Sequence, residues 1–590
     1  MCGIVGFIGR ELVAPVVLQR LKNLEYRGYD SAGMATIAEG KLWIRKDVGK
    51  LEEVQEKTHL DELPGFVGIG HVRWATHGNV TAVNSHPHPD CKCQIAVVHN
   101  GIIENYRELR DRLGPRHTFI SETDTEVIPH LIEEYMETGA SLEEAVVKTT
   151  KQLEGSYALL VISTADPRKI VATRKDSPLV VGMAEAGNFV ASDGLCFLDK
   201  TNEVAFIDDG EVVVLTEDSI AFFDSQGRQV EKEFTRFDAQ WEEATKQGHD
   251  FFMMKEIGEE STSICRALMQ DTDLIRDMAM DILRAKQVII TGSGTSRHAA
   301  IIGRYAFSKM AGKFCEAVMA SEFEYFAESI GKNTLVIAIS QSGETADVIR
   351  GVKEARQKGA TIFSLVNTRG SSLARMSDKV LYLNCGPEIC VAATKSFASQ
   401  LAIFYMLSFA MINKLGEGIE CLKAISAKID ANLRRNGKGL KELTERTKGN
   451  DHFYYIARGI NFATAIEGAL KLKEISYIHA EGMPAGELKH GTLSLIEEKT
   501  PVVVICPNDY CYADTLANAA EAKSRGALII GVSDKRNPVF DYWIEVPKVE
   551  EIFYPLVTVV PLQLLAYHLA VARGLDPDKP RNLAKSVTVI

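Results

Sequence analysis

Cys2 carries the chemistry that the start of this chain allows. The chain begins Met1-Cys2-Gly3, and removal of the initiator methionine would leave Cys2 with a thiol and a free α-amine on one residue. Such an amine has an ordinary pKa of about 7.7–8.0, so it accepts a proton near neutral pH. A thiol beside a base is a nucleophile for acyl transfer. The N-terminus therefore predicts a covalent acyl-transfer site, although a cysteine at position 2 is a weak signal by itself.

Four polar clusters follow in the first 125 residues. They are residues 71–78 (HVRWATHG), 85–88 (SHPH), 99–101 (HNG) and 121–125 (SETDT). Arg73 is suited to hold a carboxylate through two parallel hydrogen bonds, and Asp124 to pair with an ammonium group. Asn100 and the backbone N–H of Gly101 are suited to form an oxyanion hole. A substrate with an α-amine, an α-carboxylate and a side-chain amide is glutamine.

Two hydroxyl-rich turns in the second half predict an anion site. Residues 291–296 (TGSGTS) and 340–345 (SQSGET) each follow an expected strand and precede an expected helix. Backbone N–H groups at the start of a helix bind anions. Neither turn is a Walker loop, and the first does not complete the dinucleotide fingerprint. Hydroxyl-lined phosphate binding of this kind predicts a sugar phosphate rather than a nucleotide.

The elements of the first half must position the acyl-transfer residues. Apolar runs predict strands at residues 4–8, 95–98, 158–162 and 211–215, and helices are expected near 14–24, 105–113, 124–137 and 142–153. Strands in close succession favour a layered, largely antiparallel α+β architecture. The pattern becomes polar around residues 237–248, which predicts a linker.

The second half alternates apolar strands with helical stretches. The expected strands are residues 288–291, 334–339, 361–366, 453–457, 501–506 and 528–532. Alternation of this kind predicts βαβ units and a parallel sheet covered on both faces. Residues 354–362 resemble residues 521–529, and the strand–turn at 291–292 matches 458–459 with the same spacing along the chain. The second half is therefore predicted to be two copies of one doubly wound domain that meet around residues 415–450.

The bulk composition limits the partners. The chain has 590 residues, enough for three or four domains, and a net charge of −12, which argues against a nucleic-acid partner. The stretches 397–412 and 553–572 have no formally charged residue, but Pro, Gln, His and Ser interrupt them, so buried helices are expected rather than membrane spans. No signal-peptide pattern opens the chain. The 11 cysteines are scattered and odd in number, which predicts reduced thiols in the cytoplasm.

The first half resembles the N-terminal-nucleophile glutamine amidotransferases. The resemblance rests on the opening CGIVG and on RWATHG, HNG and SETDT in this order, and it covers most of residues 1–235. It implies an αββα sandwich in which Cys2 attacks the glutamine amide, its amine acts as the base, and Asn100 with Gly101 forms the oxyanion hole. It also implies a gate at Trp74 and a glutamine-binding set of Arg73, Thr76, His77, His86 and Asp124.

The second half resembles a pair of sugar-isomerase (SIS) domains. The resemblance rests on the two hydroxyl-rich turns and on the segments 467–474 (EGALKLKE), 486–491 (GELKHG) and 580–589 (PRNLAKSVTV). It implies that Lys585, next to Ala584, forms a Schiff base with the opened ketose and that Glu474 moves a proton between C1 and C2. Lys471 lies at i−3 from Glu474, which places both on one helix face. His490 is implied to assist ring opening from a neighbouring subunit. The implied phosphate ligands are Ser296, Ser340, Gln341, Ser342 and Thr345, with Thr295 and Val391 at the sugar hydroxyls.

Over its full length the chain resembles the family of isomerising aminotransferases that make an amino sugar phosphate. The expected domains are an amidotransferase domain (1–237), a linker (238–249), two SIS domains (250–415 and 416–575) and a tail (576–590). The resemblance implies that glutamine is hydrolysed and that its ammonia converts fructose 6-phosphate to glucosamine 6-phosphate, the first step of hexosamine synthesis. It implies no cofactor, no nucleic-acid or membrane partner, and at least a dimer, because His490 would cross an interface.

Alternatives remain open at this point. Residues 86–93 (HPHPDCKC) have metal-ligand residue types, but the two prolines and tight spacing make tetrahedral closure by this segment awkward, so no metal is expected. A phosphoribosyl-pyrophosphate amidotransferase would share the first half but not the duplicated second half. A sugar-phosphate-sensing regulator would need neither Cys2 nor Lys585. A catabolic deaminase would not need the glutamine site.

Overall fold

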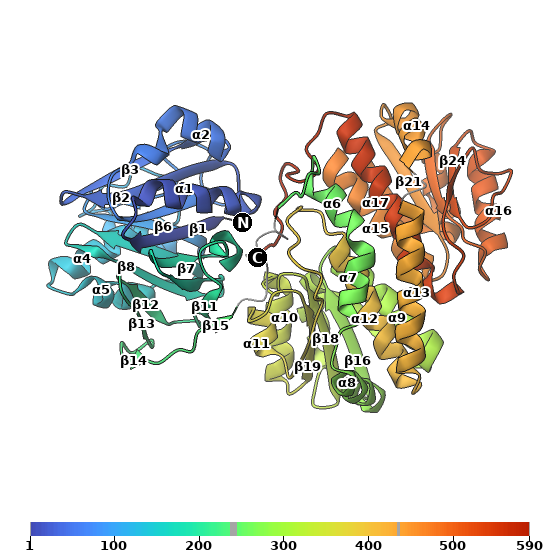
Figure 1. The fold of residues 1–590 in the computed structure, drawn as a ribbon, viewed down its shortest axis with the longest axis horizontal. Helices are drawn as coiled ribbons and strands as arrows, with labels where there is room; N and C mark the ends of the chain where they lie inside the picture. The colour runs from blue at the N-terminus through green and yellow to red at the C-terminus, as the bar shows by residue number, and fades with distance from the viewer. Residues whose placement is uncertain (1, 237–244, 434–436, 589–590) are drawn as a thin grey trace. The chain divides into compact units, whose positions relative to one another are not determined.

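The computed structural model describes residues 2–236, 245–433 and 437–588. The chain divides into two compact units, Met1–Ala244 with Ala584–Ile590, and Thr245–Leu583. Figure 1 shows the helices and strands of both units. Most of the expected linker, residues 238–244, lies outside the described residues, and the domain boundaries proposed from the sequence stay predictions.

The first unit contains two antiparallel sheets. Their strand orders are β15-β11-β9-β10-β1-β4-β2-β3 and β14-β13-β12-β8-β7-β6-β5. The first sheet consists of β1 (Gly3–Gly9), β2 (Ser31–Ala38), β3 (Lys41–Val48), β4 (Val67–Arg73), β9 (Val180–Ala184), β10 (Gly187–Ala191), β11 (Glu203–Phe206) and β15 (Thr235–Arg236). The second consists of β5 (His88–Pro89), β6 (Ile95–Ile103), β7 (Gly155–Ser163), β8 (Asp166–Lys175), β12 (Val212–Leu215), β13 (Ile220–Phe223) and β14 (Gln229–Val230). The helices are α1 (Val13–Leu24), α2 (Leu51–Thr58), α3 (Tyr106–Leu113), α4 (Val127–Glu137) and α5 (Leu142–Thr150).

The two sheets and the helices form four layers, because successive side chains along each strand point to opposite faces of its sheet. On β1, Ile4 and Ile8 point into the core shared by the two sheets, whereas Val5 and Phe7 pack with α1 on the opposite face. Strand β6 alternates in the same way between the shared core and the layer formed by α4 and α5. A strand buried on both faces reads as a continuous apolar run because every side chain has a packing partner. The αββα sandwich is thereby confirmed.

The second unit contains two parallel sheets with the same topology. Their orders are β17-β16-β18-β19-β20 and β22-β21-β23-β24-β25. The first consists of β16 (Gln287–Gly292), β17 (Glu316–Met319), β18 (Thr334–Ser340), β19 (Thr361–Val366) and β20 (Lys379–Tyr382). The second consists of β21 (His452–Ala457), β22 (His479–Pro484), β23 (Pro501–Ile505), β24 (Leu528–Ser533) and β25 (Tyr542–Glu545). The helices are α6 (Phe252–Gly258), α7 (Glu260–Ala267), α8 (Thr272–Arg284), α9 (Thr295–Ala311), α10 (Ala346–Gln357), α11 (Ser372–Met376), α12 (Lys395–Met411), α13 (Leu415–Leu433), α14 (Gly437–Thr447), α15 (Asn461–Ser476), α16 (Tyr512–Lys523) and α17 (Tyr554–Ala572).

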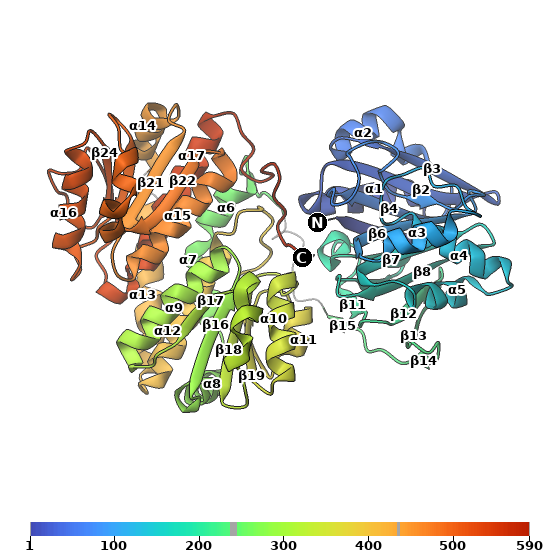
Figure 2. The ribbon, with the colours of Figure 1, turned by 180° about the vertical axis from the view of Figure 1, so that it is seen from behind.

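The predicted duplication is confirmed by strand positions and by coverage of the sheets. Strands β18 and β23 begin at Thr334 and Pro501, and β19 and β24 begin at Thr361 and Leu528, so each pair keeps the spacing of the sequence repeat. In the first copy, α10 and α11 cover one face of the sheet and α9 and α12 cover the other (Figure 2). Both faces of a parallel sheet are buried in this way, as the βαβ alternation predicts.

The two uncharged stretches of the sequence form buried helices. Helices α12 and α17 lie in the main core of the second unit, and α17 packs along α15. Among the described residues, one helical segment, Glu551–Ala572, is long and apolar enough to cross a membrane, and 83% of its apolar window is buried inside the protein. This burial is typical of a core helix.

Candidate active site

The Cys2 thiol lies where the start of β1 meets the end of β4. Strand β1 pairs antiparallel with β4, with Gly3 opposite Val72, so the residue after β4 is brought to Cys2. The Trp74 N–H donates to Cys2 Sγ at 3.2 Å, and the sulfur lies 3.4 Å from the Trp74 carbonyl. Burial raises the pKa of the Cys2 thiol, while the Trp74 N–H and the charge of Arg73 act to lower it. The thiol therefore depends on its surroundings, or on a nearby base, for activation.

The expected oxyanion residues reach the same place from β6. The Asn100 side-chain amide donates to the Cys2 carbonyl oxygen at 3.0 Å, so a hydrogen-bond donor stands beside the nucleophile. Gly101 follows with φ at +133°, and a Cβ there would lie 2.0 Å from the Ser156 carbonyl oxygen on β7. Only glycine fits this close strand approach. The pairing of β6 with β7 therefore fixes the backbone of both residues.

Arg73 and Asp124 are buried charges near the thiol. The Arg73 guanidinium donates to backbone carbonyls of the following loop, at 3.3 Å to Asn79 and 3.4 Å to Gly78. Burial lowers its pKa. One Asp124 oxygen accepts the Ile103 N–H at 2.8 Å, which anchors the carboxylate on β6. The two charges act in opposite directions on the Cys2 thiol, since Arg73 lowers and Asp124 raises its pKa. A ligand with both an ammonium and a carboxylate matches this pair of charges.

His86 lies in a group of buried histidines. Its ring stacks on that of His71 with centroids 4.0 Å apart and planes 6° apart. Burial lowers the pKa of both rings well below the ordinary value, so both are neutral. His86 Nδ1 accepts the His99 N–H at 3.3 Å, and His71 Nε2 donates to the His99 carbonyl at 3.0 Å. His86 is therefore tied to His99, the residue before Asn100, and its role in glutamine binding stays a prediction.

The remaining residues expected at the glutamine site lie on the loop after β4. Thr76 is exposed and His77 half-buried, with the His77 ring edge-on to Tyr106 at 5.5 Å. Trp74 is half-buried and meets Tyr29 edge to face at 5.8 Å. Their roles in glutamine binding and gating stay predictions.

The hydroxyl-rich turn after β18 forms a compact loop at the carboxyl end of the parallel sheet. Ser340, the last residue of β18, lies 2.8 Å from Thr345 between hydroxyl oxygens, and it accepts the Gly343 N–H at 3.0 Å. Gly343 has φ at +70°, and a Cβ there would lie 2.1 Å from the Ser371 hydroxyl. The Gln341 backbone carbonyl accepts the Asn367 N–H at 2.9 Å, which ties the loop to the end of β19. Helix α10 begins directly afterwards, so the loop, with Ser342 at its centre, has the form of an anion site.

The turn after β16 is linked to the second copy through Glu467 on α15. Thr295 donates its hydroxyl to Glu467 Oε1 at 3.0 Å, and His298 Nδ1 lies 2.6 Å from Glu467 Oε2. Ser296 accepts from the Gln400 amide at 3.1 Å. Sequence reasoning includes Glu467 in a motif but predicts no role for it. The available signal is its helical spacing, since it shares a face with two further charged residues at i+4 and i+7.

Those two residues, Lys471 and Glu474, form the ion pair that their spacing predicts. Lys471 Nζ lies 2.5 Å from Glu474 Oε2 and 3.6 Å from Glu467 Oε1. Burial opposes the charge on Lys471, but the two carboxylates outweigh it and raise its pKa. The amine is therefore an ammonium, and Glu474 is its partner.

The other residues expected at the sugar site lie on the loop before α12, in a 3-10 helix and in the C-terminal tail. The Val391 N–H donates to the Asp578 carbonyl at 3.2 Å, which ties its loop to the tail. His490 ends the 3-10 helix η6 (Ala485–His490) and is exposed. Ala584 and Lys585 are half-buried and group with the first compact unit. Their action on a sugar stays a prediction.

The comparisons with known proteins agree with this division of the chain. A glutamine amidotransferase domain model matches residues 78–199, and an SIS domain model matches residues 281–410 and 448–573. The two SIS matches begin at residues 281 and 448, and this separation equals the one between the starts of β18 and β23.

Relatives match over the whole length. The chain is 46% identical over 603 residues to a Thermococcus kodakarensis protein and 46% identical over 596 residues to a Methanothermobacter thermautotrophicus protein. A Clostridium tetani protein is 42% identical over 610 residues. In each case 100% of both chains is covered, and each relative is named glutamine--fructose-6-phosphate aminotransferase [isomerizing].

Solved structures match the second unit. The C-terminal domain of glucosamine-fructose-6-phosphate aminotransferase from Francisella tularensis has a TM-score of 0.53 at 32% identity, covering 57% of this chain and 99% of that one. A putative phosphosugar isomerase from Silicibacter pomeroyi has a TM-score of 0.50 at 25% identity, covering 56% and 100%. With full-length identity above 40% to proteins of one name, this chain belongs to the isomerising glutamine–fructose-6-phosphate aminotransferase family.

Proposed function

We propose that this protein is a glutamine-dependent aminotransferase that converts fructose 6-phosphate and glutamine to glucosamine 6-phosphate and glutamate. The observation that carries the proposal is the hydrogen bond from the Asn100 side-chain amide to the Cys2 carbonyl oxygen, in a chain whose second unit has two SIS domains. The names of the full-length relatives support the substrates. A phosphoribosyl-pyrophosphate amidotransferase would not need two SIS domains.

In the first half-reaction, Cys2 Sγ attacks the glutamine side-chain carbonyl carbon. The α-amine of Cys2, freed by removal of Met1, takes the thiol proton and later gives it to the departing ammonia. The Asn100 amide and Gly101 N–H donate to the oxyanion of the tetrahedral intermediate. Water then hydrolyses the thioester, which releases glutamate and restores the thiol.

In the second half-reaction, the loop at residues 340–345 holds the sugar phosphate. His490 of a neighbouring subunit assists ring opening, so the enzyme acts as a homodimer. Its proposed location is the cytoplasm. The Lys585 amine condenses with the C2 carbonyl, with loss of water, and ammonia then displaces the lysine at C2. Glu474 moves a proton from C1 to C2, which gives the aldose. The pairing of Glu474 with Lys471 supports its role as a carboxylate base.

Ammonia has to pass between the two half-sites without being protonated. Bulk water would protonate the ammonia, so the proposal requires that water be excluded from it, with Trp74 as the proposed gate at the glutamine site.

The decisive experiment supplies amide-¹⁵N glutamine and fructose 6-phosphate and measures the mass of the sugar product. We expect the ¹⁵N label in glucosamine 6-phosphate, and its absence would contradict the proposal. The variant Cys2→Ala should lose glutamine-dependent synthesis and keep sugar isomerisation. Cys93→Ser, at an exposed thiol, is the matched control and should keep both.

Borohydride trapping tests the sugar half independently. The protein with fructose 6-phosphate should be labelled at Lys585, because reduction fixes the Schiff base at the lysine that formed it. If borohydride attaches the sugar to another lysine, and still attaches it to the Lys585→Arg variant, Lys585 does not form the Schiff base. That result would not affect the proposed glutamine hydrolysis.

A further inference from the structure

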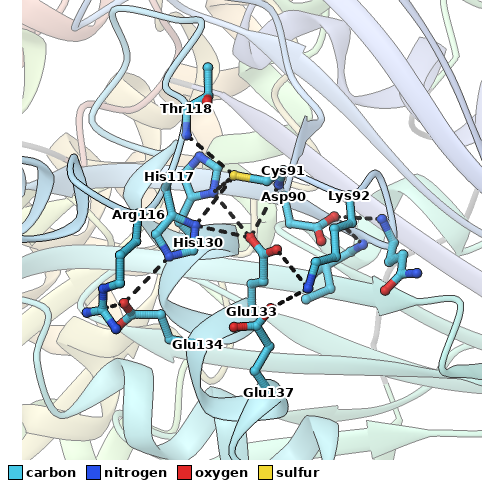
Figure 3. Close-up of polar contacts among 12 residues, drawn as sticks. Asp90, Cys91, Lys92, Arg116, His117, Thr118, His130, Glu133, Glu134 and Glu137 are labelled. Carbon is cyan, nitrogen blue, oxygen red and sulfur yellow. Dashed lines mark hydrogen bonds and ion pairs between the residues drawn. The ribbon is translucent and has the colours of Figure 1, made fainter.

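A second group of reactive side chains gathers in the first unit, apart from the residues assigned to glutamine. Cys91 lies in the turn between β5 and β6, His117 in the segment between α3 and α4, and His130 and Glu133 lie one turn apart on α4. Their ligand atoms all lie within 4.8 Å of one another, and Figure 3 shows them pointing toward a common centre. Of the cysteines and histidines in residues 86–93, only Cys91 belongs to this group.

The distances match the edges of a tetrahedral metal site. Cys91 Sγ lies 3.4 Å from His117 Nδ1 and 3.5 Å from His130 Nδ1. Glu133 Oε2 lies 3.2 Å from His117 Nδ1 and 3.6 Å from His130 Nδ1. For zinc bond lengths of about 2.3 Å to sulfur and about 2.05 Å to nitrogen or oxygen, tetrahedral edges are about 3.5 Å from sulfur to nitrogen and about 3.3 Å from nitrogen to oxygen. Four edges of this tetrahedron are therefore already near their bonded length.

Burial and charge favour a divalent cation over an empty cluster. The side chains of His117, His130 and Glu133 are 5%, 1% and 6% exposed, while Cys91 is open to solvent and offers an entry path. One thiolate, one carboxylate and two neutral imidazoles would together balance the charge of a divalent ion.

The surrounding groups orient the ligands as in known metal sites. His117 Nδ1 faces the cluster, and its other ring nitrogen lies 3.5 Å from Glu134 Oε1, which is itself paired with Arg116. A carboxylate behind a ligating histidine fixes the ring orientation. The Thr118 N–H donates to Cys91 Sγ at 3.5 Å, which fixes the position of the sulfur.

We propose that Cys91, His117, His130 and Glu133 bind Zn²⁺ as a structural site that ties the β5–β6 turn to α4. The mixed sulfur, nitrogen and oxygen set suits zinc, and four protein ligands leave no open position for catalysis. This site departs from the expectation of no metal, because that expectation considered only ligands from residues 86–93. Helix α4 directly follows the segment that contains Asp124, so the metal would also hold that segment in place.

The test titrates the full-length protein with Zn²⁺ against a chromophoric chelator after metal removal. All variants carry Cys2→Ala, so that the N-terminal thiol does not compete. We expect one tight Zn²⁺ per chain, and Cys91→Ser and His117→Ala should each weaken binding at least about 100-fold. Cys93→Ser is the matched control, because this exposed thiol lies two residues away and outside the group, and it should bind like the parent.

Two further readouts do not depend on substrates or activity. Co²⁺ in place of Zn²⁺ should give the visible bands of a tetrahedral ion and a thiolate charge-transfer band that Cys91→Ser removes. Zn²⁺ should raise the melting temperature of the parent and of Cys93→Ser, but not of Cys91→Ser. Absence of stoichiometric binding, or equal binding by Cys91→Ser at a retained fold by circular dichroism, would overturn the site and leave the proposed function intact.

Discussion

Gly101 combines an unusual backbone conformation with a very close neighbour. Its φ is +133°, and an added Cβ would lie 2.0 Å from a backbone oxygen of the paired strand. Gly101→Ala should push β6 from β7 and displace the proposed oxyanion donors, which lowers the glutaminase kcat by about 10²–10³. Strain of this kind also costs about 1–3 kcal/mol of stability. Steady-state glutamate release and urea unfolding measure the two effects.

Gly139 offers the matched control for this substitution. It also has a positive φ, at +93°, but an added Cβ meets nothing within 4 Å. Gly139→Ala should therefore cost stability through backbone strain alone and leave the glutaminase kcat unchanged. Equal kcat values for the two variants would show that the β6–β7 approach does not position the donors.

Glu260 is a buried carboxyl whose protonation should make stability depend on pH. Burial, with the nearby Glu388 and Glu467, raises its pKa to about 8, against the ordinary 4.5. Between these values the folded state binds more protons than the unfolded state, so the free energy of unfolding falls as pH rises. The loss between pH 6 and pH 8 is about 2 kcal/mol. Glu260→Gln should flatten this dependence in urea unfolding of the second unit.

The control is the exposed Glu420, where Glu420→Gln should leave the pH dependence as in the parent protein. A Glu260→Gln variant with the same slope as the parent would show that this carboxyl is ionised at neutral pH in the folded protein.

At the scale of elements, Asp578 joins the C-terminal tail to the start of α6. Its two carboxylate oxygens accept the N–H groups of Phe252 and Met253 at 2.7 and 2.8 Å. Asp578→Ala would leave both donors without this acceptor, which should cost about 1–2 kcal/mol. Because the tail continues to Lys585, limited proteolysis should also cut the last residues faster. Asp578→Asn keeps an oxygen acceptor, and an identical loss in both variants would point to charge instead of capping.

The elements themselves follow from the sequence where burial is periodic or continuous. The runs 158–162 and 361–366 are strands because buried β-branched and aliphatic side chains fill both sheet faces. The pairing of Lys471 with Glu474 also follows from spacing along one helix. Local pattern determines such features because the partners lie within a few residues.

Contacts between distant elements do not follow from local pattern. Cys91 meets His130 39 residues away, and Thr295 meets Glu467 172 residues away. The stacking of His86 on His71 likewise depends on how β4 faces the segment before β5. Sequence reasoning considered Cys91, Thr295 and His86 but not His130, and only the packed layers bring these pairs together.

At the scale of the whole molecule, the two SIS copies share their topology but not their loop chemistry. With the spacing of the repeat, Ser342 corresponds to Asp509 and Gly343 to Tyr510. In the second copy, Asp509 accepts from the Asn461 side-chain amide at 2.9 Å, and a carboxylate repels phosphate. We therefore expect one sugar-phosphate site per chain, within the first copy.

Calorimetric titration with fructose 6-phosphate in the Cys2→Ala background checks this number. Ser342→Ala should weaken binding about 10- to 150-fold, since a hydroxyl that meets a charged phosphate contributes about 1.5–3 kcal/mol. Asp509→Asn should leave the affinity unchanged. Two sites per chain, or a loss with Asp509→Asn, would assign phosphate binding to the second copy as well.

The buried α17 also has a consequence for synthesis on the ribosome. This apolar helix is the last one made, yet it fills the centre of the core of the second unit and packs along α15. Until it emerges, the nascent chain exposes the apolar surface that this helix will cover, and chaperones bind intermediates of that kind. A messenger truncated before codon 554 should accordingly yield insoluble polypeptide, even though every residue assigned to glutamine has already been translated.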